Sequence, residues 1–519
     1  MKLLAFCFLC ISVCANSYKI LVCYPPPIRS LNILGQGIVK HLLDAGHEVT
    51  YVTPFPSKKT RKNYNEIDLS SMQGFYDNDE ADLLNISYVM ANSEQTNNAA
   101  LLLELGTQLA IKAMEHENLQ ALLQDKTKTF DAVIVDYLDT EIYVGLAAIY
   151  NCPMIWSYSM GPNSLALQLV DEPTNPAYTA DLLSSNVPPF TFHQRVEELW
   201  LAISWNWKKW VALYPKQEEA YNRIFSPHAV RRVKELPKYQ DVVHNASLVL
   251  CNFHHATGNI PKLPQNLRMI GGYHIEKPTK ALPQDLQNLM DNSKHGVIYF
   301  SMGSTWKSKD IPKSITEGLL EIFGELKQTV IWKYEAELAN LPKNVHIMKW
   351  APQQSILAHP NLLFFISHGG LLSTTETIHF AVPQIGIPIY YDQFVNINRA
   401  VANGYAIKVG LNFELVENLK AAIQTMLTDP SYKERAKQLS SLYHDRPLPP
   451  EKELIWWVEH VIRTGGATHL TSPSRHMSWY QKLYLDLAVL IVVAILVLLK
   501  AIVAICSVNK PRRQKKKIQ

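Results

Sequence analysis

The stretch FFISHGGLLSTTETIHFAVPQIGIPIYYDQ, residues 364–393, decides the fold of this chain. An apolar run ends at Ser367, and the His-Gly-Gly sequence at 368–370 then makes a tight turn into a helix that begins near Leu371. The free backbone N–H groups at the start of such a helix, together with its dipole, suit a diphosphate. The stretch therefore predicts a β/α unit with an anion site at the turn.

Two polar side chains follow in the predicted helix. Ser373 and Glu376 are three residues apart, so they share the helix face that looks toward such an anion. The spacing Ser-His-Gly-Gly-x-x-Ser-x-x-Glu, with Asp392-Gln393 downstream, resembles the signature of the UDP-glycosyltransferases. Further segments that carry this resemblance are Trp350-Ala351-Pro352-Gln353-Gln354, Leu357-Ala358-His359-Pro360, Phe300-Ser301-Met302-Gly303-Ser304 and Asp445-Arg446-Pro447. It is strongest toward insect members, and it implies a GT-B fold of two Rossmann-like β/α domains.

The resemblance also implies how the nucleotide is bound. Trp350 would stack on the uracil, and Ala351 would offer its backbone. Gln353 would reach the ribose, and Glu376 would accept hydrogen bonds from the ribose hydroxyls. The implied diphosphate ligands are Ser304, His368, Gly370 and Ser373. The implied ligands of the sugar hydroxyls are Asp392 and Gln393. Taken singly, each residue has an ordinary explanation, such as a core aromatic or a turn histidine, and only their joint spacing favours a site.

One position departs from the family pattern. Members of the family usually place a histidine, the general base, in the loop after the first strand, and here that position is Leu31. The carboxylate that orients this histidine is matched by Asp136, which a plain strand-end role would also explain. Loss of a positioned base costs about 10²- to 10⁴-fold in rate for a hydroxyl acceptor. We therefore expect either a preference for amines, thiols or ionised phenols, or weak catalysis.

The implied reaction is an inverting transfer of a hexose from UDP-glucose or UDP-glucuronate to a small lipophilic acceptor. Glucose is favoured by the resemblance to insect members. No metal and no other cofactor is expected. The sequence leaves open two rivals, a pseudoenzyme that binds UDP-sugars or partners an active relative, and a single-pass receptor or adhesion protein. It also leaves open whether the chain forms homo- or hetero-oligomers.

Apolar runs alternate with helical patterns along the chain, which predicts parallel sheets that are covered on both faces. The runs expected as strands are 19–24, 48–53, 130–136, 153–157, 247–252, 297–301, 329–333, 345–349 and 362–367. The predicted division is a signal peptide 1–15, an acceptor domain 16–265, a linker 266–284, a UDP-sugar domain 285–445, a crossing helix and juxtamembrane segment 446–484, a transmembrane helix 485–506 and a basic tail 507–519.

The two ends of the chain indicate membrane anchoring. Residues 3–13 are apolar and too short to span a bilayer comfortably, which favours a cleaved signal peptide over an anchor. Residues 487–505 are long enough to cross, and six Lys and Arg side chains follow them, which marks that side as cytoplasmic and argues against a buried core helix. The terminal Lys516-Lys517-Ile518-Gln519 resembles a dilysine retrieval signal, although the positive-inside rule explains it equally. A luminal body in the endoplasmic reticulum membrane is expected.

Composition excludes several other classes of protein. The net charge of +4 is smaller than the charge of the tail, so no basic stripe remains for nucleic acid. Only Cys23, Cys152 and Cys251 lie in the expected luminal body, which is neither a disulfide framework nor a zinc pattern. Glycosylation sequons occur at Asn85 and Asn245.

A tryptophan-rich segment, 200–210, interleaves four Trp with two Lys residues in a helical pattern. It is consistent with an interfacial patch on the membrane and also with a helix packed on the core.

Overall fold

The computed structural model describes residues 17–57, 60–75, 90, 99–184, 186–233, 235–258, 260–303 and 311–508. The predicted signal peptide, the sequon at Asn85, the proposed ligand Ser304 and the lysines of the tail lie outside these residues.

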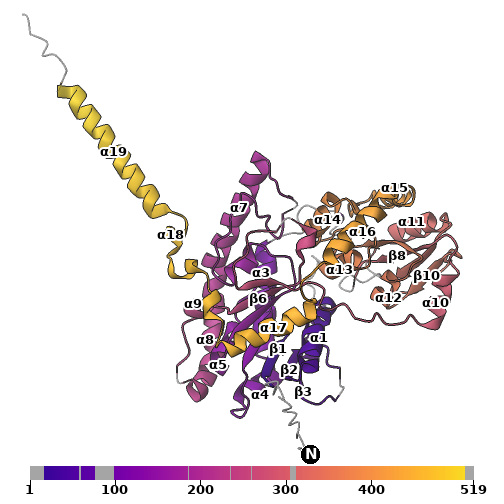
Figure 1. The fold of residues 1–519 in the computed structure, drawn as a ribbon, viewed down its shortest axis with the longest axis horizontal. Helices are drawn as coiled ribbons and strands as arrows, with labels where there is room; N and C mark the ends of the chain where they lie inside the picture. Colours follow the sequence, from indigo (N-terminus) through magenta and orange to yellow (C-terminus); the bar gives the residue numbers. More distant parts are fainter. Residues whose placement is uncertain are drawn as a thin grey trace, which may run out of the picture.

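The first lobe is built on a seven-stranded sheet in the order β3-β2-β1-β4-β5-β6-β7 (Figure 1), in which all neighbours are parallel. The inner strand β1 shows why the sequence folds this way: Ile20 and Val22 pack on one face of the sheet, while Leu21 and Cys23 pack on the other. The strands are β1 Lys19–Cys23, β2 Glu48–Thr53, β3 Tyr64–Asp68, β4 Ala132–Asp136, β5 Met154–Tyr158, β6 Leu248–Cys251 and β7 Leu267–Met269.

The second lobe is built on a six-stranded parallel sheet in the order β10-β9-β8-β11-β12-β13. Its strands are β8 Val297–Ser301, β9 Thr329–Lys333, β10 Val345–Met348, β11 Leu362–Ser367, β12 Gln384–Gly386 and β13 Ala406–Lys408. Four of the predicted strands, 48–53 in the first lobe and 297–301, 329–333 and 362–367 in the second, have the bounds that the sequence predicts.

Helices cover the sheets, as parallel strand connections require. Those of the first lobe are α1 Arg29–Asp44, α3 Ala99–Met114, α4 Glu117–Gln124, α5 Val144–Tyr150, α6 Ser164–Gln168, α7 Phe192–Lys208, α8 Tyr214–Arg232 and α9 Tyr239–Val242. Those of the second lobe are α10 Gln284–Asp291, α11 Lys313–Gly324, α12 Gln353–Leu357, α13 Leu371–His379, α14 Gln393–Ala402, α15 Leu415–Thr428 and α16 Ser431–His444.

Each sheet reverses its winding direction at one point. In the first sheet this point lies between β1 and β4, and in the second it lies between β8 and β11. Ligands of open parallel sheets bind outside the carboxyl ends of the strands at such points. The two reversal points therefore predict where a site between the lobes should lie.

The chain returns to the first lobe after the second is complete. Helix α17 (Pro450–Arg463), in the segment predicted to cross back, buries Leu454, Val458 and Val461 in the core that holds β1 and α1. Strand β7 belongs to the first sheet, so this lobe extends past residue 265 into the segment expected as linker, because pairing with β6 extends the sheet by one edge strand.

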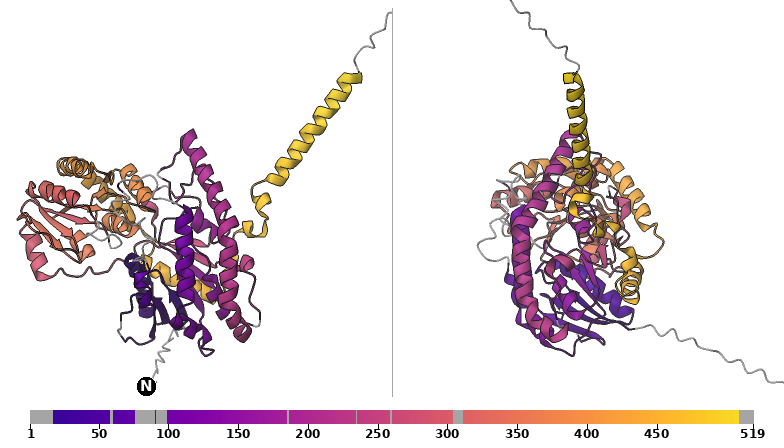
Figure 2. Two further views of the ribbon diagram at one scale, coloured as in Figure 1. Left: turned by 180° about the vertical axis from the view of Figure 1, so that it is seen from behind. Right: turned by 90° about the vertical axis from the view of Figure 1, so that its left-hand side faces the viewer.

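The C-terminal helix projects away from both lobes. Helix α18 (Trp479–Lys482) leads into α19 (Leu485–Val508), which Figure 2 shows standing free of the body. Within the part of the chain that the structure describes, Leu485–Ile505 is the one helix long and apolar enough to cross a membrane. The prediction of a C-terminal membrane helix agrees with this finding.

Candidate functional site

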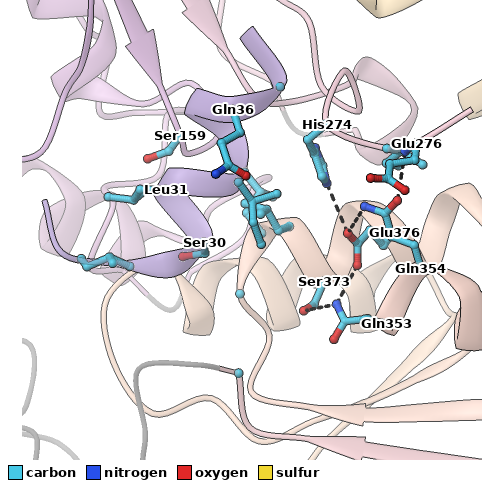
Figure 3. Close-up of a pocket in the computed structure, with 18 of the residues that line it drawn as sticks. Ser30, Leu31, Gln36, Ser159, His274, Glu276, Gln353, Gln354, Ser373 and Glu376 are labelled. Atoms are coloured by element: carbon cyan, nitrogen blue, oxygen red, sulfur yellow. Dashed lines mark hydrogen bonds and ion pairs between the residues drawn. The ribbon is translucent and has the colours of Figure 1, made fainter. Parts of the chain in front are cut away.

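A cleft of about 740 Å³ lies where the two lobes face each other. One wall comes from the first lobe and includes Ser30, Leu31 and Gln36 of α1 and Ser159 after β5 (Figure 3). The other wall comes from the segments that follow the strands β8 to β12 of the second sheet, including the starts of α12, α13 and α14. It contains most of the predicted ligands, namely Trp350, Ala351, Gln353, His368, Gly370, Ser373, Glu376, Asp392 and Gln393.

Side-chain hydrogen bonds connect helices α12 and α13 on the second wall. The Gln353 amide donates to Ser373 Oγ at 3.1 Å and to Glu376 Oε2 at 2.6 Å, and the Gln354 amide donates to Glu376 Oε1 at 2.9 Å. From the first lobe, His274 places its Nε2 3.5 Å from Glu376 Oε1. Figure 3 shows these groups converging on the Glu376 carboxylate, which is thereby fixed in orientation.

The turn before α13 holds a neutral histidine. A Cβ added to Gly303 would lie 2.6 Å from His368 Cε1, and one added to Gly370 would lie 2.6 Å from His368 Nε2, so only glycine fits on either side of the ring. Burial, and then the nearby Lys333 ammonium, lowers the pKa of His368 to about 4. Helix α13 begins at Leu371, where the sequence predicts a helix start, and its N-cap residue Gly370 provides no side-chain cap for the first N–H groups.

The indole of Trp350 is 58% exposed at the edge of this wall. Lys333 Nζ and the Arg29 guanidinium each lie 5.9 Å from the centre of the ring, so cations flank a flat aromatic surface. Lys333 ends β9 and donates to the Gly303 carbonyl oxygen at 2.8 Å. Lys333 and His274 were not predicted from the sequence, because neither lies in a recognisable motif.

The last two predicted ligands begin α14. Burial raises the pKa of Asp392 to about 6, and its Oδ2 accepts a hydrogen bond of 2.8 Å from Asn396. Gln393 Oε1 accepts from the Ile389 amide N–H at 2.9 Å, which closes the turn before the helix. Beside them, Tyr391 donates to Asp139 of the first lobe at 2.8 Å, a link between the walls that the sequence does not predict.

The residue at which the resemblance implies a base, Leu31, faces the cleft. Leu31, only 7% exposed, lines the cleft from α1. Asp136, at the end of β4, is fully buried and does not line the cleft; among the residues that the structure describes, none donates a hydrogen bond to either of its oxygens. Burial raises the pKa of this carboxyl well above its usual range.

Two parallel-sheet lobes with a cleft at their winding reversals define the GT-B class of glycosyltransferases. Solved structures agree: a glycosyltransferase of kitacinnamycin and the calicheamicin glycosyltransferase CalG4 match with TM-scores of 0.56 and 0.54, each at 15% identity over 86% of this chain and 99% of theirs. At that identity the likeness shows the fold alone.

Sequence comparison then gives the family. The family model described as UDP-glucoronosyl and UDP-glucosyl transferase matches residues 19–518, and the chain belongs to this family of UDP-glycosyltransferases. UDP-glucosyltransferase 2 of Dactylopius coccus is 33% identical over 92% of this chain and 90% of its own length. UDP-glucuronosyltransferase 2B1 of Rattus norvegicus is 30% identical over 66% of this chain and 63% of its own. The resemblance found in the sequence is thus confirmed, while the roles of single residues stay predictions.

Proposed function

We propose that this enzyme transfers a hexose from a UDP-sugar to small lipophilic acceptors, with inversion at the anomeric carbon. The observation that carries the proposal is the convergence of Gln353, Ser373 and Glu376 beside an uncapped helix start in the cleft. Such a set offers acceptors for ribose hydroxyls and donors for a diphosphate within one wall.

The groups on that wall support an assignment for each part of the donor. The exposed Trp350 ring offers a stacking surface for uracil, and Glu376 accepts hydrogen bonds from the ribose hydroxyls. The first N–H groups of α13 bind the diphosphate, and Lys333, whose charge lowers the pKa of His368, supplies a cation. Asp392 and Gln393 hold the sugar hydroxyls.

The reaction needs one displacement. The acceptor's lone pair attacks the anomeric carbon from the face opposite UDP, and the carbon–oxygen bond to the β-phosphate breaks with its electron pair on UDP. Fixed N–H donors and Lys333 stabilise the charge that develops on the diphosphate. The acceptor's proton, where it has one to lose, passes to solvent because Leu31 accepts none.

This last point restricts the acceptor. An amine attacks through a free lone pair, and a thiolate or phenolate is already ionised, whereas an alcohol relies on a positioned base. We infer that the enzyme favours amines, thiolates and phenolates over alcohols. We favour glucose as the sugar, because the relatives from Dactylopius coccus include one named as a glucosyltransferase.

We also propose that the body lies in the lumen of the endoplasmic reticulum. The support is the apolar helix α19 followed by the basic tail, which the positive-inside rule orients toward the cytoplasm. The exposed Asn245, in the turn before β6, would then meet the glycosylation machinery. A shift in mobility after glycosidase treatment, abolished in Asn245→Gln together with Asn85→Gln, tests this orientation.

The test of the activity is UDP release by microsomes that carry the full chain. UDP-glucose and UDP-glucuronate are each offered with a matched amine and alcohol, and parallel samples contain a chelator. Release with an amine and UDP-glucose, unchanged by the chelator, is expected. UDP binding without release from any pair would favour the rival, a UDP-sugar-binding pseudoenzyme or a partner subunit of an active relative.

A further inference from the structure

Helix α7 and the π-helical turn η3 (Lys209–Leu213) that continues it carry an apolar stripe on the outside of the first lobe. Six large side chains of this stripe, each 51% to 68% exposed, are Phe192, Val196, Trp200, Ile203, Trp207 and Trp210. Their steps of four, four, three, four and three residues keep them on one face along the whole length of the helix. The sequence left open which way these tryptophans face, and the structure turns this stripe outward.

The opposite face of the same helix is buried, where Trp205 packs with Leu103 and Leu213 and polar side chains make specific contacts. Glu198 accepts from the Asp181 backbone N–H at 2.7 Å, and Trp205 donates from its Nε1 to Asp181 Oδ1 at 3.0 Å. Lys209 Nζ lies 2.5 Å from Glu141 Oε1, with both side chains buried. A surface helix whose outer face meets water normally carries polar side chains on that face and apolar side chains toward the core. The apolar stripe is thus held rigidly outward by specific polar contacts.

The stripe lies beside the base of the membrane helix. The segment 168–172 contacts both: Gln168 donates to Asn206 of α7 at 3.0 Å, and Asp171 accepts from Lys482 of α18 at 2.5 Å. Ser472, which precedes α18, donates to Glu172 at 2.5 Å in the same segment. Figures 1 and 2 agree that α7 rises from the body on the side from which α19 leaves it.

We propose that this stripe enters the lipid bilayer as a second membrane contact, in addition to α19. Lipid is the occupant because the stripe lies on the side of the body from which α19, an apolar helix with no buried surface, departs (Figures 1 and 2). The segment that leads into α19 also exposes Trp479 and Tyr484, side chains typical of the membrane interface. The exposed Lys208 is placed beside the stripe, where a cation can reach headgroups.

The proposed membrane contact is also connected to the cleft. Glu141, the partner of Lys209, is two residues from Asp139, whose carboxylate accepts the bond from Tyr391 at the cleft wall. The inserted helix is therefore connected by two polar contacts to the place where the lobes meet. Docking on the bilayer sets the first lobe against the phase in which lipophilic compounds dissolve.

The test places an environment-sensitive dye on the full chain in phosphatidylcholine vesicles, with or without bromine on the acyl chains. The dye is attached to Trp200→Cys, in the middle of the stripe, or to Val230→Cys as the matched control. Val230 is 76% exposed near the end of α8, which Figure 1 shows running away from α19. Signal from dye on the unsubstituted chain is subtracted, and equal thermal unfolding midpoints establish that both variants fold.

The proposal expects blue-shifted emission at position 200 that brominated lipid quenches, and water-like, unquenched emission at position 230. Water-like emission at both positions would overturn it, because the stripe would then face solvent. Blue-shifted emission at position 200 that bromine does not quench, and that grows with the ratio of protein to lipid, would also overturn it, since a second copy of the chain would then cover the stripe.

Discussion

The two walls of the cleft differ in how completely their polar groups are paired. On the second-lobe wall the Glu376 carboxylate accepts hydrogen bonds from two glutamine amides. On the first-lobe side the position of the base is a buried leucine, Leu31, and the carboxyl of Asp136 has no donor among the described residues. Under the proposed function, donor binding and acceptor activation are separable in this chain, because the proposed donor ligands are paired with one another while Leu31 stands at the position proposed for the base.

The largest expected effect comes from giving the first-lobe wall a base. Leu31→His should raise the turnover of an unactivated alcohol by about 10²- to 10⁴-fold and change the turnover of a matched amine little. Rates of UDP release with each acceptor measure this. Leu31→Asn is the control, because its side chain is polar but accepts no proton near pH 7. An equal gain in Leu31→Asn would mean that polarity, and not proton transfer, limits the natural chain.

The second wall should respond to loss of its central carboxylate. Glu376→Ala removes two charged hydrogen bonds and leaves both glutamine amides without this acceptor, so kcat/KM for the UDP-sugar should fall by about 10- to 100-fold. Glu417→Ala, on the exposed face of α15 in the same lobe, is the control and should leave the value unchanged. Equal values in all three chains would remove Glu376 from the binding account.

The pH dependence of donor binding should sharpen the contrast further. Since the pKa of Asp392 is raised to about 6, its carboxylate is ionised at pH 7 and becomes protonated as the pH falls. The KM for UDP-glucose should therefore rise by about tenfold between pH 7 and pH 5. His368, with its pKa near 4, stays largely neutral in that range. In Asp392→Asn the profile should be flat, and an unchanged slope there would assign the titration to another group.

A smaller effect is expected in stability. Burial raises the pKa of Asp136, so the folded state keeps its proton while the unfolded state releases it as the pH rises above the ordinary value, and folding becomes less favourable. Asp136→Asn should remove this penalty and stabilise the chain by about 1–3 kcal/mol at pH 8, and by less at pH 5. Thermal unfolding at both values measures it. Asp285→Asn, at an exposed site on α10, should show no such pH-dependent gain.

The sequence predicted the strands that are buried on both faces, because such strands are continuous apolar runs. Strands β8, β9 and β11 begin and end where that pattern does. The apolar pattern did not predict β3, an edge strand of the first sheet with partly buried or exposed residues. It also did not predict the three-residue strands β7, β12 and β13. Strands this short are defined by pairing with their neighbours, which no local pattern records.

The site was predictable where spacing along one helix brings side chains together, as with Ser373 and Glu376 on α13. It was not predictable where distant segments meet. Lys333 approaches Trp350 because β9 and the segment after β10 end at the same edge of the second sheet. His274 reaches Glu376 only because the two lobes fold against each other. The burial of Asp136 outside the cleft likewise depends on the helices packed around β4, and not on its own sequence context.

The most direct test of the account is a double-mutant cycle between position 31, on the first-lobe wall, and the buried Asp136 of the same lobe, measured as turnover of an alcohol acceptor. The account holds that Asp136 is the carboxylate that would orient a histidine general base, and that Leu31 replaces this histidine. It predicts that Asp136→Asn leaves the rate of the natural chain unchanged but cancels most of the gain in Leu31→His. Equal effects of Asp136→Asn in both backgrounds would contradict it, because the carboxyl would then act independently of position 31.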